Sequence, residues 1–397
     1  MIDLLLDEHS LWRDQVSPAE AAFLEKVRSF AEKSVAPHAD EWERAEELPR
    51  AIFEEAGRIG LMGVAVPRKF GGLGFGYATY ALAIREVAKY QGALAIDIAA
   101  HNALAVGHIL SQGSPAQHRK VFPRLVNGEW IGAWALTEPE AGSDSGGVQT
   151  TGTQVAGGAW ELNGFKRFIT LGRKADALVV MAATGVTEKG RKEISAFLVE
   201  KSQIKPVRKV PTCGLRASET SEFRLVKAKA ELLGPRGTGQ AAALACLDKG
   251  RIGVAAVSLG LARAAFDAAL RHSVTRRQFG KRLGDFQAIQ FMLADCEVEL
   301  RAAEMLVLEA SILATKGVRH TTQSAVAKLY ASEAASRICN RSLQIHGGYG
   351  YTRDIPIERY WRDARLSEIG EGSSEVQRIV ISRALLKSLD GALESAR

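Results

Sequence analysis

One carboxylate near the end of the chain stands between two glycines. Glu371 belongs to the run Gly370-Glu371-Gly372-Ser373, which comes just before a helix predicted to start near Ser374. The neighbouring glycines leave the carboxylate sterically free to reach a ligand. The amides of Gly372 and Ser373 would lie at the positive end of that helix, where an anionic group is stabilised. The pattern therefore indicates a ligand site at this point of the chain.

Three further segments combine aromatic, hydroxyl and glycine residues in ways that suit a planar ligand. Residues 134–144 leave a predicted strand and enter a loop of hydroxyl and small residues, whose donors can approach an acceptor-rich ligand. Phe168, Ile169 and Thr170 end another predicted strand and place an aromatic face beside a hydroxyl. Residues 344–350 interrupt a helix with three glycines in four residues, which permits close backbone approach. An ordinary turn would explain the first and third segments equally well.

Other catalytic patterns are incomplete in this chain. The glycine run at residues 71–76 follows no clear strand and lacks the spacing of a phosphate-binding loop. Residues 142–146 miss the spacing of a nucleophilic serine by one position. The eight histidines never fall at metal-ligand spacing and the four cysteines form no CxxC pair. The sequence therefore predicts neither a metal site nor a disulfide scaffold.

Composition and charge restrict the class of protein further. The 397 residues are 46% hydrophobic and 24% charged, which is typical of a folded protein of two or three domains. The formal net charge of +7 is spread along the chain without a basic block, so no nucleic-acid-binding arm is predicted. No stretch reaches the ~20 uninterrupted apolar residues of a membrane span, and residues 1–14 do not resemble a secretory signal. We therefore expect a cytoplasmic protein of bacterial type.

The elements that must position these segments fall into three blocks. Capping boxes followed by proline, at Ser17 and Ser114, begin helices in the first block. Residues 130–236 are rich in Thr, Val, Phe and Trp, and residues 150–155 and 160–170 suggest a β-hairpin. Apolar stripes of helical spacing return after Thr238. The expected fold is mainly α with a middle β-domain, with domains at residues 1–129, 130–236 and 237–397.

Taken in order along the chain, these motifs resemble those of the acyl-CoA dehydrogenase family. ALTEPEAGSD at residues 135–144 and QIHGGYGYTRDIPIERYWRD at residues 344–363 are similar to its two signatures. RRQFGK (276–281), FQAIQFMLAD (286–295) and EGSSEVQR (371–378) occur in the family's order and spacing. The resemblance covers essentially the whole chain. It implies an N-terminal helical domain, a middle β-barrel or sandwich and a C-terminal four-helix bundle.

The resemblance implies an FAD-dependent oxidoreductase of acyl-CoA metabolism. Glu371 would take the α-proton of an acyl-CoA while the β-hydride moves to flavin N5, giving a trans-2-enoyl-CoA. Electrons would then pass to an electron-transfer flavoprotein. Burial would make the carboxylate more basic, and the Glu371 amide would donate to the thioester oxygen and stabilise the enolate. An acyl-CoA oxidase, a flavin monooxygenase of the same fold and a non-catalytic acyl-CoA-binding protein are the alternatives.

The family's site residues can be carried over position by position. Within one chain, the resemblance implies that FAD contacts Trp134, Leu136, Thr137, Ser143, Phe168, Ile169, Thr170, Ser373 and Glu375. A neighbouring subunit would supply to the same cofactor Arg276, Gln278, Phe279, Gln287, Gln344, Gly347 and Gly348. The acyl-CoA would contact Ser143, Asp248, Arg251 and Gly372. A site shared in this way implies a homotetramer built as a dimer of dimers.

Some positions depart from the family pattern. Gly250 stands where certain branches carry the catalytic carboxylate, which leaves that role to Glu371. Gly370 replaces a common Tyr and opens space near the α-carbon, so we expect either a short or medium acyl group or a branched, bulky one. Leu171 replaces the usual Asn, which removes a supporting hydrogen bond. Phe168 replaces the usual Trp, which reduces the stacking area.

Overall fold

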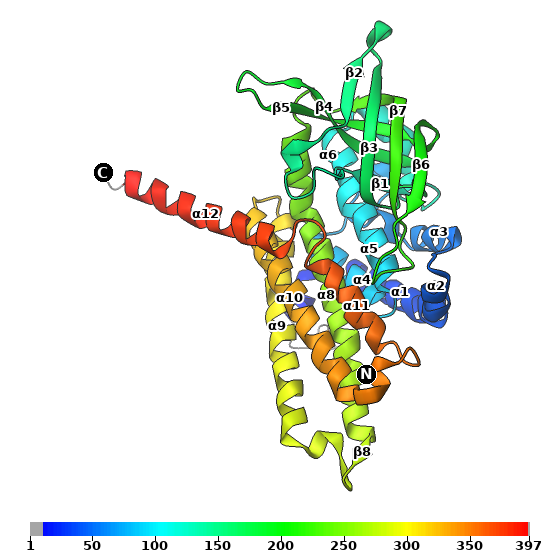
Figure 1. The fold of residues 1–397 in the computed structure, drawn as a ribbon, viewed down its shortest axis with the longest axis vertical. Coiled ribbons are helices and arrows are strands. Elements are labelled where there is room, and N and C mark those ends of the chain that lie inside the picture. The colour runs from blue at the N-terminus through cyan, green and yellow to red at the C-terminus, as the bar shows by residue number, and fades with distance from the viewer. Residues whose placement is uncertain (1–10, 396–397) are drawn as a thin grey trace.

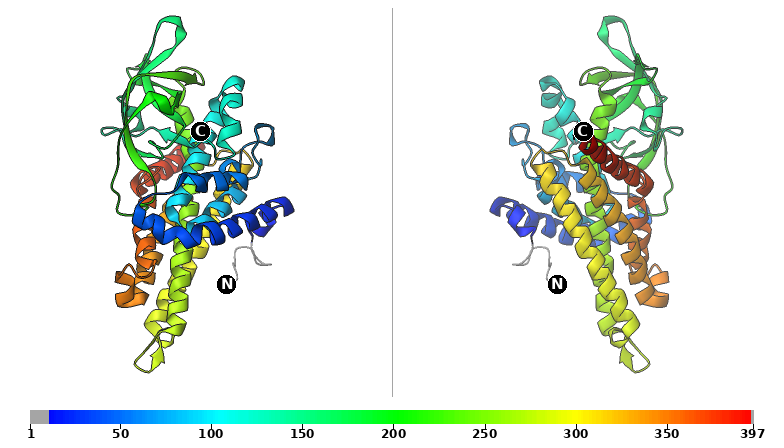
Figure 2. Two further views of the ribbon diagram at one scale, coloured as in Figure 1. Left: turned by 90° about the vertical axis from the view of Figure 1, so that its right-hand side faces the viewer. Right: turned by 90° about the vertical axis from the view of Figure 1, so that its left-hand side faces the viewer.

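The computed structural model describes residues 11–395 and has the expected order of helices, strands and helices. Figure 1 shows the strands gathered at one end and a column of long helices reaching the other. The two side views in Figure 2 place the N-terminal helices against the middle of that column. Most of the stretch tested for a secretory signal, residues 1–14, lies outside the described residues.

The N-terminal block consists of short helices, two of which begin at the predicted capping boxes. In the first box the Ser17 amide donates to the Glu20 carboxylate at 3.0 Å, and in the second the Ser114 amide donates to Gln117 at 2.9 Å. The helices of this block are α1 (Pro18–Phe30), α2 (Ala39–Ala45), α3 (Arg50–Arg58), α4 (Tyr77–Ala88), α5 (Gly92–Ala99), α6 (Gly107–Gln112) and α7 (Pro115–Leu125). Helices α4 and α5 are buried along nearly their whole length, because α4 packs against α1, α8 and α9 and α5 packs against α4 and α8.

The β-block is a sheet that closes on itself. Its strands are β1 (Gly132–Ala135), β2 (Thr151–Gln154), β3 (Trp160–Thr170), β4 (Ala177–Val186), β5 (Lys192–Glu200), β6 (Ile204–Lys209) and β7 (Thr220–Leu233). The predicted hairpin is confirmed, since β2 and β3 pair antiparallel with Thr151 opposite Asn163. Strand β4 pairs with β1, β2 and β5, and β7 joins β3 to β5, which completes a small barrel.

The C-terminal block is built on three long helices. Helix α8 (Gly239–Thr275) runs from the strands to the far end of the column, where β8 (Arg277–Gln278) and β9 (Lys281–Arg282) form a short hairpin. Helix α9 (Gln287–Thr315) returns, and α10 (Thr321–His346) packs along both α8 and α9. Helix α11 (Ile357–Ser367) packs on α8 and α10, and α12 (Ser374–Ser395) extends away from the column (Figure 1).

Two helical stretches are long and apolar enough to span a membrane by composition alone. They are residues 92–112 and α8, and 89% of the apolar window of each is buried inside the protein. The alanine- and valine-rich surface of these helices is therefore covered by the chain itself, as in the core helices of a folded domain.

Candidate active site

The Glu371 carboxylate is held inside the protein by a strained turn. Glu371 has φ +53° and Gly372 has φ +93°, both in the left-handed region that a residue with a side chain seldom adopts. The carboxylate oxygen Oε2 is buried and has no hydrogen-bond partner among the described residues. A Cβ placed on Gly250 of α8 would lie 2.0 Å from Oε2. The carboxylate thus occupies space that only a glycine at position 250 leaves free.

Burial makes this carboxylate a stronger base than an exposed glutamate. Removal from water raises the pKa of Glu371 to about 7, while the positive charges of Lys328 and Arg251 oppose that rise. A group with this pKa is partly deprotonated near neutral pH and can both take and hold a proton. Among the hydrogen bonds of residues 11–395, none has the Glu371 N–H as its donor. The same residue therefore offers a base and a free amide.

Beside this carboxylate, α8 carries an ion pair between Asp248 and Arg251, two of the predicted acyl-CoA contacts. Arg251 Nη1 donates to Asp248 Oδ1 at 2.7 Å, and Thr321 Oγ1 donates to Asp248 Oδ2 at 2.6 Å. Arg251 is only 4% exposed, and burial lowers its pKa. Asp248 also faces a cavity of about 490 Å³ between α6, α8 and the start of α10, which Cys246 helps to line. The structure thus brings Asp248 and Arg251 together next to Glu371.

A buried ion pair fixes the loop at residues 135–144. Lys166 of β3 is fully buried, and its ammonium group lies 2.7 Å from Glu138 Oε1 and 2.9 Å from the Leu136 carbonyl. The other oxygen of Glu138 accepts from the amide of Gln149 at 2.6 Å. In addition, the Arg167 amide donates to the Thr137 carbonyl at 3.0 Å. These bonds hold Leu136 and Thr137 against the end of β3.

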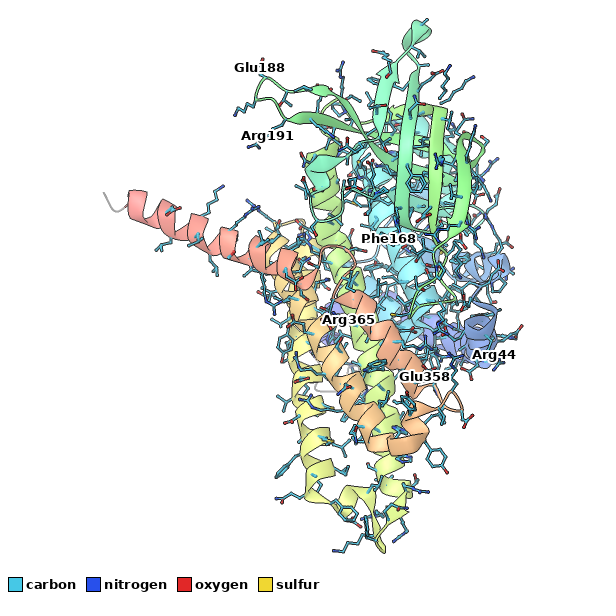
Figure 3. All side chains as sticks on the ribbon, viewed as in Figure 1. Arg44, Phe168, Glu188, Arg191, Glu358 and Arg365 are labelled. Atoms are coloured by element: carbon cyan, nitrogen blue, oxygen red, sulfur yellow. The ribbon has the colours of Figure 1, made fainter. Side chains whose placement is uncertain are left out.

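Phe168 lies at the end of β3 that faces the helices (Figure 3). Its backbone has φ +56°, and its ring is 52% exposed with the Arg167 guanidinium 4.7 Å from the ring centre. By contrast, Ile169 is 2% exposed, and Leu171 is fully buried with φ +62°. The turn therefore presents an aromatic face to solvent on a rigid support, and a planar ligand can stack on such a face.

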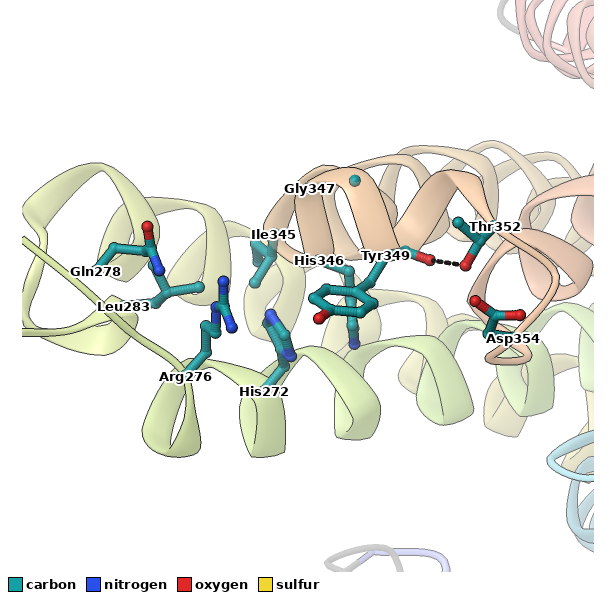
Figure 4. Close-up of a pocket in the computed structure, with 11 residues that line it drawn as sticks. His272, Arg276, Gln278, Leu283, Ile345, His346, Gly347, Tyr349, Thr352 and Asp354 are labelled. Carbon is teal, nitrogen blue, oxygen red and sulfur yellow. Dashed lines mark hydrogen bonds between the residues drawn. The ribbon is translucent and has the colours of Figure 1, made fainter.

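A second cavity lies at the far end of α8. It has a volume of about 530 Å³ and is lined from α8 and the following hairpin by His272, Arg276 and Gln278, and from the end of α10 by His346 and the turn that follows. Figure 4 shows these side chains facing one another across the cavity. The rings of His272 and His346 stack at 4.5 Å. Arginine, amide and glycine donors of this kind suit an anionic ligand.

These two groups of predicted residues cannot serve one ligand within a single chain. Gly250 lies on α8 and Arg276 is the residue directly after that helix, so at 1.5 Å per residue they are separated by about 39 Å. A dinucleotide is roughly half as long. The structure therefore brings Glu371, Asp248 and Arg251 together, and separately Arg276, Gln278 and Gly347.

The remaining predicted site residues lie mostly on the surface. Trp134 of β1 donates from Nε1 to His108 at 3.3 Å and is partly buried, and Thr170 at the end of β3 is also partly buried. Ser373 is partly buried just before α12, where its hydroxyl lowers the pKa of Glu375 by hydrogen bonding. Phe279 is 91% exposed at the tip of the β8–β9 hairpin. The exposed members of the predicted set are Ser143, Phe168, Arg276, Gln278, Phe279, Gln287, Gln344, Gly347, Gly348 and Glu375.

Sequence reasoning missed the buried polar residues that support the site. They are Tyr80, Glu138 as an ion-pair partner, Lys166, Lys328 and Gln377. The spacing of apolar residues on α10 could have predicted that Lys328 is buried, because Lys328 lies between Ala327 and Ala331 on the buried face of that helix. Among residues 11–395, no group of three or more His, Cys, Asp or Glu side chains is arranged to hold a metal ion.

Comparison with known families covers nearly the whole chain. Residues 17–129 match the acyl-CoA dehydrogenase N-terminal domain, residues 133–228 the middle domain and residues 237–386 the C-terminal domain. The fold and the domain matches together define a member of the acyl-CoA dehydrogenase family, and the chain belongs to that family.

Individual relatives are similar over almost their full length. A short-chain-specific acyl-CoA dehydrogenase of Clostridium acetobutylicum is 40% identical over 91% of this chain and 96% of its own. The CarC subunit of a caffeyl-CoA reductase–Etf complex from Acetobacterium woodii is 39% identical over 91% of this chain and 96% of its own. Butyryl-CoA dehydrogenase from Megasphaera elsdenii superposes with a TM-score of 0.91 at 38% identity, over 94% of this chain and 99% of the other. The chain is accordingly an enzyme of the acyl-CoA dehydrogenase type.

Proposed function

We propose that this enzyme removes two hydrogens from the Cα–Cβ bond of an acyl-CoA thioester and releases the trans-2-enoyl-CoA, with FAD as its cofactor. The observation that carries the proposal is the buried Glu371 carboxylate, whose Oε2 has no hydrogen-bond partner among the described residues. A buried, unpaired carboxylate costs stability, and such a cost persists where the group has a chemical task. Proton abstraction next to a thioester carbonyl is a task that requires this basicity.

Glu371 supplies two functions to the proposed reaction. Its carboxylate, with a pKa of about 7, takes the α-proton and holds it on an oxygen that has no competing partner. Its free N–H can donate to the thioester oxygen as negative charge develops there, and one such donor typically contributes about 10²–10³ in rate. Glu371 has φ +53°, and the strained turn that imposes this angle sets the direction of both its N–H and its side chain.

The residues near Glu371 and at the far end of α8 fit FAD when two chains are combined. The exposed Phe168 face and the rigid Leu136–Thr137 backbone would hold the flavin ring of one site. The cavity that contains Arg276 and Gln278 would hold the diphosphate and adenine of a site on another copy. When bound, FAD accepts the two electrons and the β-hydrogen. The separation of these regions along α8 supports the proposed homotetramer, a dimer of dimers.

The proposed substrate is either a short acyl-CoA or one with a branched or bulky acyl group. A Cβ placed on Gly370 would come no closer than 3.5 Å to any neighbour, so the glycine leaves open space where a larger side chain would fit. The similarity to a short-chain-specific dehydrogenase supports the first possibility, and the similarity to a subunit of a caffeyl-CoA reductase complex supports the second. Relative rates with butyryl-CoA, isobutyryl-CoA and 3-phenylpropanoyl-CoA distinguish them.

The proposed electron acceptor is an electron-transfer flavoprotein. A relative that is 39% identical is named as part of an Etf complex, which supports this partner. The expected cytoplasmic location stays a prediction from the sequence.

The decisive experiment is Glu371→Gln, with Glu309→Gln on the exposed surface of α9 as the matched control. Anaerobic addition of the three acyl-CoA compounds should bleach the flavin absorbance of the wild type and the control. We expect the Glu371 variant to remain yellow and folded, with flavin reduction slowed by about 10²–10⁴-fold. Unchanged bleaching would remove Glu371 from its role. Rapid oxygen consumption by the substrate-reduced wild type would instead indicate an oxidase.

A further inference from the structure

Lys328 is a buried lysine directly beneath the Glu371 turn. It belongs to α10, and its side chain has no exposed surface. A buried ammonium group is costly unless it is paired, and burial lowers the pKa of Lys328 to about 8 although the Glu371 charge opposes that effect. The apolar packing of α10 would be served better by a hydrophobic residue. The presence of a lysine here therefore calls for an explanation other than packing.

The Lys328 ammonium group fixes the backbone that carries Glu371. Its Nζ donates to the carbonyl of Gly372 at 2.7 Å. Gln377, also fully buried, donates to the same carbonyl at 2.8 Å and to the Glu371 carbonyl at 3.3 Å. Two buried donors on one carbonyl hold a turn in which both Glu371 and Gly372 have positive φ. Such a strained turn persists only when its surroundings determine it.

Lys328 is also the cation best placed to act on the Glu371 charge. The titratable and charged groups that interact with Glu371 come from three helices: Tyr80 of α4, Cys246 and Arg251 of α8, and Lys328 of α10. Burial raises the pKa of Tyr80 and of the Cys246 thiol, so both stay neutral at physiological pH. Arg251 is paired with Asp248 at 2.7 Å. Lys328 instead donates to an uncharged carbonyl, and the carboxylates of Glu368 and Glu375 act on its charge more weakly than Glu371 does.

We propose that Lys328 is a positioning residue for Glu371, with two separable effects. Its N–H group holds the Gly372 carbonyl and thereby aims the carboxylate into the space above Gly250. Its charge keeps Glu371 available in the deprotonated form at neutral pH. Gln377 contributes to the first effect only, because an amide carries no charge. This inference rests on the proposed role of Glu371 as the base and assigns how that base is kept ready.

The test compares Lys328→Gln, which keeps a donor but loses the charge, with Gln377→Leu, which loses a donor but keeps the charge. The measurement is the rate of anaerobic flavin reduction between pH 6 and 9.5, using whichever of butyryl-CoA and 3-phenylpropanoyl-CoA reduces the wild type faster. Loss of an adjacent positive charge raises a carboxyl pKa by about one unit or more. We therefore expect Lys328→Gln to be about fivefold slower at pH 7 and to recover at pH 9, with KM little changed.

The matched variants sharpen the outcome. Gln377→Leu should be slower at every pH without a shift of the profile, and Lys328→Arg, which restores the charge, should return the profile to that of the wild type. A Lys328→Gln variant whose rate changes with pH as the wild-type rate does would overturn the proposal, whether or not the rate itself is lower. A lysine with a purely structural role would lower the rate equally at every pH.

A second readout does not depend on catalysis. Replacement of Glu371 by Gln in the wild-type and Lys328→Gln backgrounds isolates the contribution of the carboxyl group to thermal stability at each pH. The pH at which that contribution stops changing should be about one unit higher in the Lys328→Gln background. If the wild type is not reduced by any acyl-CoA, the proposed function fails. If it is reduced and neither readout shifts, only the role of Lys328 fails.

Discussion

Two regions along helix α8 differ in their exposure: one is enclosed by the chain and the other is open to solvent. Around Gly250, near one end, the chain encloses a carboxylate, two cations and a tyrosine so fully that Oε2 of Glu371 is shielded from solvent. At the other end, Arg276, Gln278 and Phe279 are exposed around an open cavity. The first region is assembled from residues of one chain, and its burial provides the exclusion of water that the proposed proton abstraction requires. The second is open to solvent in the single chain, and in the proposed assembly FAD and a neighbouring copy would cover it.

The largest effect is expected at the enclosed end, from Gly250→Ala. The added methyl group would overlap Glu371 Oε2, which is 2.0 Å from the Cβ position, and Leu104, whose methyl carbon is 2.7 Å away. The carboxylate must move, and a displacement of about 1 Å typically costs about 10²-fold in rate. Flavin reduction in stopped flow measures the loss. Flavin content and melting temperature serve as controls, since alanine favours the helix, and a fully active variant would show that the carboxylate is not confined as described.

A smaller effect is expected at the open end, from Arg276→Ala. This change removes a cation that lines the cavity, whereas Arg277→Ala removes an adjacent exposed cation that does not line it. A hydrogen bond to a charged group contributes about 1.5–3 kcal/mol, so FAD affinity should fall about 10- to 100-fold in the first variant and little in the second. FAD retained after gel filtration reports the difference. Equal retention by both variants would separate this cavity from cofactor binding.

The third prediction, measured as stability and not as rate or affinity, concerns the enclosed carboxylate. Between pH 4.5 and about 7 the unfolded chain releases the Glu371 proton while the folded protein keeps it, so stability falls as pH rises through this window. Below this window the stabilisation from the raised pKa of Glu371 is fully present, and above it that stabilisation is lost, which lowers the free energy of unfolding by on the order of 3 kcal/mol. Glu371→Gln lacks this titration, so its melting temperature should exceed that of the wild type increasingly from pH 4.5 to 7. A constant difference across that range would contradict the raised pKa.

The sequence predicted those features that depend on local chemistry. The capping boxes at Ser17 and Ser114, the β2–β3 hairpin and the end of α10 at its glycines are all confirmed, because each is determined by residues within a few positions of one another. Strands β6 and β7 were not predicted. Five of the fourteen residues in β7 are exposed, and the strand is stabilised by pairing with β3, β5 and β6, which lie elsewhere in the sequence.

The supporting polar residues could not have been found in the same way. Lys166 and Lys328 are residues that usually lie on the surface, and only the packed structure shows that both ammonium groups are buried with partners 28 and 44 positions away. The positive φ of Phe168 and Glu371 is equally invisible in the sequence, because neither residue favours it and the tertiary environment imposes it. The candidate base could be named from sequence, but the groups that tune it could not.

The length of α8 has a genetic consequence for an assembly with shared sites. A variant that has lost Glu371 and a variant that has lost Arg276 are each inactive when assembled only from identical copies. When one copy of each variant pairs, one of the two reaction centres contains both substitutions. The other centre contains an intact Glu371 from one chain and an intact Arg276 from the other. In the proposed assembly, two inactive alleles of this gene would therefore complement each other when expressed together, because the roughly 39 Å from Gly250 to Arg276 would divide each chain between two centres.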